Sequence, residues 1–354
     1  MKGKYKKIKI KENHKKEKLK REKFFNYGLA LLKSYMAFLV LVSHCFNMKT
    51  TKNELLIKFT TNRQLHVPSF FIMSFYFTYK TLLSLSLKKF LNRLMRLLIP
   101  YIIWPMIAIK INHYYNLNYR KRFRDTYDDL ILQIKWARRC LPQFWFQWNL
   151  IFLTIFFYTI IFIFRKHSLF IFYILLLYAY YAQYTGYHIN SYFKKYPDVI
   201  SYLFETLPFA VTGFTLGYYK IIDFFQNYKI KTFILSAIIY KIIADYNIFR
   251  RIRGLNFQGI NLNIQSICVI FIFSLFPSDK IKNELLQKLL TLITNYSAGV
   301  FYLHFSVRDY FGIYIDDIKN GTFKGIFINY FICYFVCFIG MKIFGKTPLR
   351  YLFS

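Results

Sequence analysis

Long apolar stretches alternate with short polar connections along the whole chain. Ten of them approach the roughly 20 residues that a helix needs to cross a bilayer. They fall at residues 25–46, 68–87, 94–112, 145–164, 168–184, 200–219, 231–247, 260–277, 289–307 and 325–344. The sequence therefore predicts an all-α, polytopic integral membrane protein with about ten transmembrane helices.

The connections predict one membrane domain. No internal repeat is visible, and no glycine-rich or proline-rich linker is long enough to separate a second domain. We expect a basic tail at 1–23, a membrane domain at 24–345 and a short cytoplasmic C-terminus at 346–354. The longest connection, 113–144, has apolar residues at helical spacing and is expected to lie partly on the membrane as an amphipathic helix; these are Leu130, Ile131, Ile134 and Ala137.

Charge favours a membrane partner over nucleic acid. The 354 residues carry a formal net charge of +34, and the tail at 1–23 holds twelve Lys or Arg against three Glu. A basic block directly before a membrane helix is typical of a disordered cytoplasmic tail that faces anionic lipid. No DNA-binding or RNA-binding motif accompanies the charge, so we expect no nucleic-acid partner.

The orientation prediction rests on this tail, because the other connections show no excess of Lys and Arg on the same side. We expect both termini in the cytoplasm and the protein in the plasma membrane. The apolar run after the tail is longer than the core of a cleaved signal, so we expect no cleavage there. The five cysteines lack metal-ligand spacing, which predicts no metal site, and Cys333 and Cys337 are expected to pack one helical turn apart.

The first apolar stretch contains two ionisable residues, Lys33 and His44. Eleven residues make three helical turns plus about 20°, so the two side chains share one face about 16 Å apart. A structural explanation is a lysine that reaches the interface and a hydrogen-bonded histidine. We favour a functional one, because ionisable residues at membrane depth are costly, and histidine can exchange a proton near neutral pH.

A basic cluster follows the second stretch, where the chain should re-enter the cytoplasm; it comprises Lys88, Lys89, Arg93 and Arg96. Anchoring at a positively charged cytoplasmic face is a sufficient explanation. Arginines there could also hold a phosphorylated donor through charge-assisted hydrogen bonds.

Other ionisable residues are less informative. Lys241 and Asp245 are four residues apart and are expected to form an ion pair along one helix. Glu205 lies three residues before Pro208, and no motif assigns it a role. His304 is equally compatible with an interface histidine and with a second polar group at a site.

Several segments together resemble a known family. "LKSYMAFLVLVSHCF" (32–46), "HVPSFFIMSFYF" (66–77) and "LNRLMRLLIPYIIW" (91–104) follow one another as in the N-terminal half of the acyltransferase-3 family. "PQFWFQWNLIF" (142–152) is similar to the tryptophan-containing start of its next helix. "NYSAGVFYLHFSV" (295–307) resembles its late histidine-containing stretch.

The resemblance implies a membrane enzyme that moves an acyl group, most often acetyl, from cytoplasmic acyl-CoA to a hydroxyl of an extracytoplasmic glycan. It places His44 as the general base and Lys33, in an arginine position, as a donor-holding or charge-offsetting group. Arg93 and Arg96 would bind the phosphates of acyl-CoA, the donor substrate. The substrate-binding residues would be Ser74, Trp145 and His304.

Two positions differ from the family pattern. Lysine at position 33 keeps the charge of arginine without its planar fork. Phe75 stands where the family has a glycine after Ser74, and would narrow whatever approaches there. Two other functions therefore stay open: a transporter or flippase for a glycan or lipid-linked intermediate, and an inactive membrane scaffold.

Overall fold

A computed structural model describes residues 26–46, 65–114, 130, 131, 134, 144–184, 198–246, 258–276, 281 and 283–354. The basic tail at 1–23 and most of the 113–144 connection lie outside these residues. Within that connection Leu130, Ile131 and Ile134 are helical, and Ala137 lies outside the described residues.

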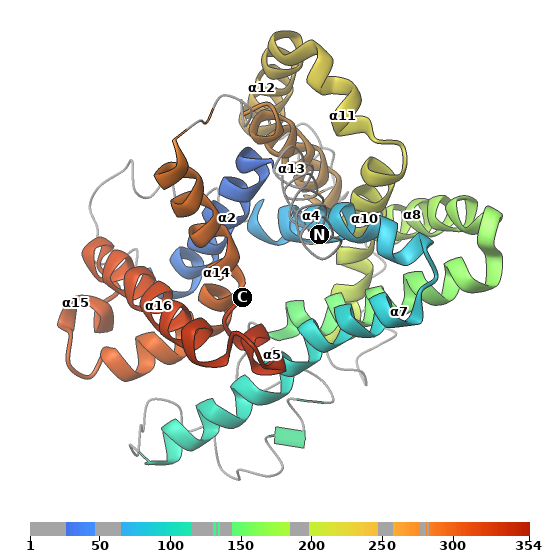
Figure 1. The fold of residues 1–354 in the computed structure, drawn as a ribbon. Coiled ribbons are helices and arrows are strands. Elements are labelled where there is room, and N and C mark those ends of the chain that lie inside the picture. The colour runs from blue at the N-terminus through green and yellow to red at the C-terminus, as the bar shows by residue number, and fades with distance from the viewer. Residues whose placement is uncertain are drawn as a thin grey trace, which may run out of the picture.

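The described residues form an all-α fold, and its long helices match the ten predicted stretches one for one (Figure 1). Short helices and turns join them. The long helices are α2 (Tyr27–Cys45), α4 (His66–Leu83), α5 (Leu87–Tyr114), α7 (Phe144–Phe164), α8 (Ser168–Tyr184), α10 (Asp198–Tyr218), α12 (Lys229–Tyr246), α13 (Gln258–Ser274), α14 (Glu284–Phe311) and α16 (Phe323–Phe344). The short elements are α11 (Ile221–Phe225), α15 (Asp316–Lys319), and the 3-10 helices η3 (Arg165–His167), η4 (Gln226–Tyr228) and η6 (Pro348–Leu352).

Four stretches of the described residues are long and apolar enough to cross a membrane. They are Tyr27–Cys45, Leu87–Lys110, Phe144–Tyr181, which contains α7 and most of α8, and Phe323–Phe344. Large apolar side chains also remain exposed on the outside of the bundle; Leu177, Ile230 and Phe331 are 68%, 76% and 67% exposed. An apolar exterior of this kind suits contact with lipid.

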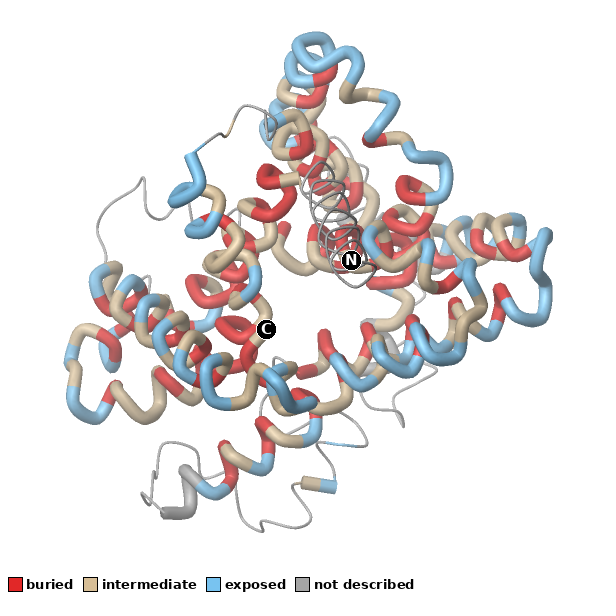
Figure 2. The backbone as a smooth tube through the Cα atoms, in the orientation of Figure 1, coloured by how far each residue is buried: buried red, intermediate tan, exposed pale blue. Residues whose placement is uncertain are grey.

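The centre of the bundle is built on close helix pairs. Helix α4 packs along α10, and α2 packs along α14, which also contacts α16. Figure 2 shows the buried positions concentrated on the inner sides of these helices. Gly213 of α10 permits a close approach to α4, because a Cβ atom there would lie 2.1 Å from the carbonyl oxygen of Ile72. These pairs bring the ends of α2, α4 and α14 together.

Tight turns join consecutive helices at three places. Leu85 between α4 and α5, Arg165 between α7 and α8, and Lys220 between α10 and α11 adopt positive φ angles of 47°, 42° and 50°. A residue with this left-handed backbone conformation allows the chain to reverse its direction within a few positions. Helix α5 therefore starts directly beside the end of α4, which places Arg93 opposite Ser74.

The last described segment is packed into the helical body. Its 3-10 helix η6 contacts α5 and α16, and Trp104 donates a hydrogen bond from Nε1 to the Leu352 carbonyl at 3.1 Å. Phe353 fits beside two glycines: a Cβ atom at Gly340 of α16 would lie 2.4 Å from its ring, and one at Gly299 of α14 would lie 2.8 Å from its backbone carbonyl oxygen. Residues 346–354, which the sequence presents as a short terminus, thus form part of the bundle.

Candidate active site

A cavity of about 830 Å³ opens between α2, α4, α5, α7, α14 and η6. This volume lies within the range of about 300–1,000 Å³ that is usual for ligand pockets. Its lining includes five basic side chains and, in the described part of the chain, neither Asp nor Glu; the basic residues are Lys33, Lys89, Arg93, Arg96 and Arg350. A site with this charge is suited to a ligand with several negative charges.

Arg93 is held in place at this cavity. Its Nη2 donates to Ser74 Oγ at 3.0 Å, and its Nε donates to Thr154 Oγ1 at 3.2 Å. The guanidinium also lies 5.7 Å from the centre of the Phe75 ring. These three neighbours, from α4 and α7, hold the guanidinium in one orientation. Its other N–H groups can then point toward a ligand.

The C-terminal segment completes the basic lining. The Tyr351 ring has the guanidinium carbons of Arg96 and Arg350 at 5.5 and 5.0 Å from its centre. Arg350 Nη2 donates to the Tyr351 hydroxyl at 3.1 Å, and this hydrogen bond lowers the pKa of Tyr351 below its usual value. An aromatic ring and two guanidinium groups thus form one recognition surface on the cavity wall.

Two histidines meet beyond the opposite end of the cavity. His44 is the second-last residue of α2, and His304 lies on α14. Their rings are stacked, with centres 5.5 Å apart and planes 23° from parallel. His44 is exposed, whereas His304 is fully buried. Two positively charged rings at this distance would repel each other, which favours a neutral imidazole in the pair.

The orientation of His304 is fixed by its own helix. Its Nδ1 lies 2.7 Å from the carbonyl oxygen of Phe301, one turn earlier. A carbonyl oxygen can only accept, so Nδ1 carries the hydrogen and Nε2 of the neutral ring has a free lone pair. This Nε2 atom is buried and has no hydrogen-bond partner among the described residues.

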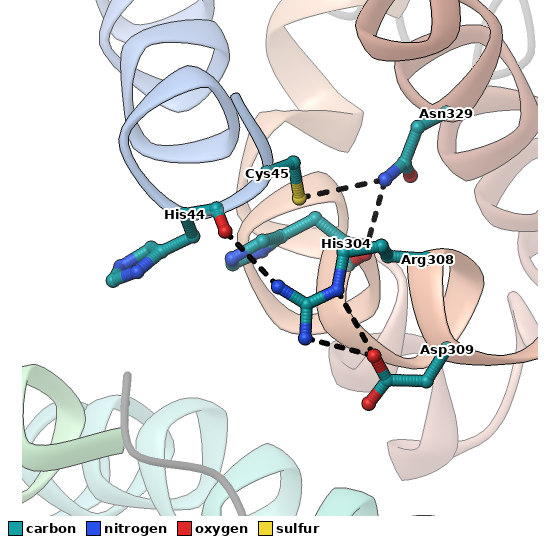
Figure 3. A network of polar contacts seen from close by, with 6 residues as sticks. All are labelled: His44, Cys45, His304, Arg308, Asp309 and Asn329. Carbon is teal, nitrogen blue, oxygen red and sulfur yellow. Dashed lines mark hydrogen bonds and ion pairs between the residues drawn. The ribbon is translucent and has the colours of Figure 1, made fainter. Parts of the chain in front are cut away.

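A polar network connects the three helices around this pair (Figure 3). Arg308 of α14 donates to the His44 carbonyl at 3.0 Å and to Asp309 Oδ1 at 2.8 and 3.0 Å. Asn329 of α16 donates to the His304 carbonyl at 3.2 Å and lies 3.6 Å from Cys45 Sγ. These contacts hold the end of α2 against α14, so both imidazoles are held at one place.

The structure gathers six of the seven predicted site residues into two groups. Lys33, Ser74, Arg93 and Arg96 line the cavity, and His44 and His304 form the pair beyond it. Trp145 is half-buried, packs on Phe146 at 6.3 Å and does not line the cavity.

Phe75 does not narrow the described cavity. Its ring is fully buried, is absent from the lining and packs on Phe157 at 4.7 Å. Glu205 is exposed and also outside the lining. The predicted ion pair between Lys241 and Asp245 is confirmed at 2.8 Å.

Sequence reasoning missed Arg308, Asn329, Arg350 and Tyr351. A signal for Arg308 exists, since it follows His304 by four residues and therefore shares its helical face. Asn329 stands as a lone amide in an apolar stretch, which is a weaker signal. Nothing in the sequence around Arg350 and Tyr351 indicates that this segment folds back onto the cavity.

Comparison with known proteins gives one match. A family model described as an acyltransferase domain, that of the acyltransferase-3 family, matches residues 26–349. Comparisons with curated proteins and with solved structures give no match. The matched range runs from the residue before α2 into η6 and contains every residue of both groups, whereas Arg350 and Tyr351 lie just after it. The chain belongs to the acyltransferase-3 family, a family of membrane acyltransferases.

Proposed function

We propose that this protein transfers an acyl group from acyl-CoA to a hydroxyl of an extracytoplasmic carbohydrate, and that acetyl is the preferred acyl group. One observation carries the proposal. The same two helices, α2 and α14, line the basic cavity along one part of their length and carry the pair of histidines farther along. The cavity suits a polyanionic donor, and the pair suits removal of a proton from an acceptor.

The donor would place its phosphates against the basic lining. Arg96 and Arg350 are exposed at the cavity and can each form charge-assisted hydrogen bonds to phosphate oxygens. Tyr351, whose ring lies near both guanidinium groups, would add aromatic surface for an adenine ring. Lys33 lies about 16 Å along α2 from His44. It would therefore hold the donor at a distance from the reacting carbonyl.

The histidine pair would perform the proton transfer. His44, the exposed member, takes the proton of the acceptor hydroxyl as its oxygen attacks the thioester carbonyl. The Nε2 atom of His304 would accept a hydrogen bond from a second, non-reacting hydroxyl of the acceptor and so orient it. The carbon–sulfur bond then breaks, the proton passes from His44 to the leaving thiolate, and an ester and free CoA are formed.

Ten crossings with the N-terminus inside fit this chemistry. In that orientation the cavity, which contains Asn26 and Lys89, faces the cytoplasm where acyl-CoA is found. His44, at the other end of α2, faces the side where a surface glycan lies. Donor and acceptor would then approach the reaction centre from opposite sides of the membrane.

The test uses membranes from cells that express the full chain. Membranes are supplied with radiolabelled acetyl-CoA, and incorporation of label into the carbohydrate fraction is measured. We expect incorporation with the parent protein and a large loss with His44→Ala. A parent protein that transfers no label to any fraction would refute the proposal and leave the transporter and scaffold functions.

A further inference from the structure

Three phenylalanines close the inner end of the cavity. Phe70 comes from α4, Phe146 from α7 and Phe301 from α14, and all three line the cavity. Their ring centres are 5.8 Å apart for Phe70 and Phe146, 5.3 Å for Phe146 and Phe301, and 6.4 Å for Phe70 and Phe301. Each ring therefore contacts both others, and we name this group the phenylalanine cluster.

The phenylalanine cluster lies between the cavity and the histidine pair. Along α4 the lining runs from Phe70 to Thr81, so Phe70 is the lining residue farthest from the α4–α5 turn. Along α14 the lining starts at Thr294 and ends at Phe301 and Tyr302, and the Phe301 ring lies 6.2 Å from that of His304. Neither histidine lines the cavity. An acyl group that extends from the cavity toward the histidines must therefore meet these rings.

The cluster has little room to move. Phe146 and Phe301 are each 7% exposed. Behind Phe146 lies Phe71, fully buried, with ring centres 4.6 Å apart. Displacing one ring would displace others in a close-packed interior, which is energetically costly.

We propose that the phenylalanine cluster sets the maximum length of the acyl group that this protein transfers and restricts it to short-chain donors. The inference rests on the proposed function. With CoA held by the basic residues, the acyl chain points at the three rings, and each further methylene must compete with them for space. A close-packed apolar pocket discriminates against one methylene by about 10- to 200-fold.

The test is a competition between two donors in one reaction. Acetyl-CoA and butanoyl-CoA are supplied together at equal concentration to membranes containing the full chain, and acetyl and butanoyl esters on the carbohydrate fraction are quantified by mass spectrometry. We expect the parent protein to favour acetyl by at least about 10-fold, and Phe301→Ala to reduce that preference by about 10-fold or more. The ratio is measured within one preparation, so the amount of folded protein cancels.

Phe172→Ala is the matched control. This phenylalanine is also fully buried among aromatic rings, with Phe157 at 4.3 Å and Phe214 at 5.3 Å, but it does not line the cavity. It should keep the parent ratio. If Phe301→Ala is inactive with both donors, the milder Phe301→Leu and Phe70→Leu replace it and should shift the ratio in the same direction.

The outcomes separate the two claims. An unchanged ratio in the cluster variants, a parent that prefers butanoyl, or an equal shift in Phe172→Ala would overturn the inference and leave the proposed function intact. A parent that transfers neither acyl group would overturn the proposed function and this inference with it.

Discussion

The stacked histidines allow a test in which single and double substitutions are compared. The changes are His44→Ala, His304→Gln and both together. Glutamine at 304 keeps a polar side chain of similar length and removes the imidazole. If the two rings act on one bound acceptor, His44 on the reacting hydroxyl and His304 on a neighbouring one, their losses of activity should not multiply.

The structure sets the expected sizes. General base catalysis contributes about 10²–10⁴-fold, or about 2.7–5.4 kcal/mol, so His44→Ala should lose that much. His304 supplies one acceptor to an uncharged hydroxyl, and a bond of this kind contributes about 0.5–1.5 kcal/mol, or roughly 2- to 13-fold. Because the rings are 5.5 Å apart and both contact Phe305, at 5.0 and 4.7 Å, the double variant should lie within a few-fold of His44→Ala.

The assay is transfer of label from radiolabelled acetyl-CoA to the carbohydrate fraction, normalised to the amount of protein in the membrane. Ser43→Ala is the control, because its hydroxyl bonds only within α2, to the Val40 carbonyl at 2.7 Å, and it neighbours His44 in the chain. Turnover of His44→Ala within about twofold of the parent would refute the assignment of the base. Losses that multiply in the double variant would show that the two rings act independently.

Substitutions at three further positions, Lys33, Arg350 and Gly340, test the cavity. Lys33→Arg should keep or raise transfer and Lys33→Met should lose it, because the cation holds the donor; an active Lys33→Met contradicts this role. Arg350→Ala should raise the KM for acetyl-CoA about 10-fold, as expected for a lost bond to a charged group, whereas Lys346→Ala, exposed and outside the lining, should not. Gly340→Ala places a Cβ atom 2.4 Å from the Phe353 ring. It should lower the thermal unfolding midpoint in detergent and raise the same KM; an unchanged midpoint would show that the ring can move at little cost.

The sequence predicted the helices well because the length of an apolar stretch can be read directly from neighbouring residues in the chain. Each of the ten expected stretches is a helix, with ends that differ by a few residues. The ion pair of Lys241 and Asp245 and the buried positions of Cys333 and Cys337 were also predictable, since they depend on spacing along one helix. The number of membrane crossings stays a prediction beyond the four stretches that qualify by length and apolar character.

The site itself was only partly predictable. Lys33, Ser74, Arg93 and Arg96 belong to segments that follow one another in the chain, and short turns bring them together. His304 is 260 positions from His44, and no local pattern reveals that α14 packs along α2.

The remaining site residues depend on tertiary contacts. Arg350 reaches the cavity because Phe353 is seated against glycines of two other helices. Trp145, expected to bind substrate, does not line the cavity, because which side chains of an apolar helix reach a cavity depends on the packing of its neighbours.

The seating of Phe353 beside Gly299 and Gly340 has a thermodynamic consequence. The Phe353 ring, the Trp104 hydrogen bond and the contact of Tyr351 with Arg96 help to hold the segment from Pro348 to Phe353, and Arg350 and Tyr351 belong to the proposed donor site. Binding and docking are then linked, so each favours the other by the same free energy. At a donor concentration about 100 times its Kd, the docked state gains about 2.7 kcal/mol over any state that cannot bind. The segment from Pro348 to Phe353 would therefore resist limited proteolysis more strongly when acyl-CoA is bound.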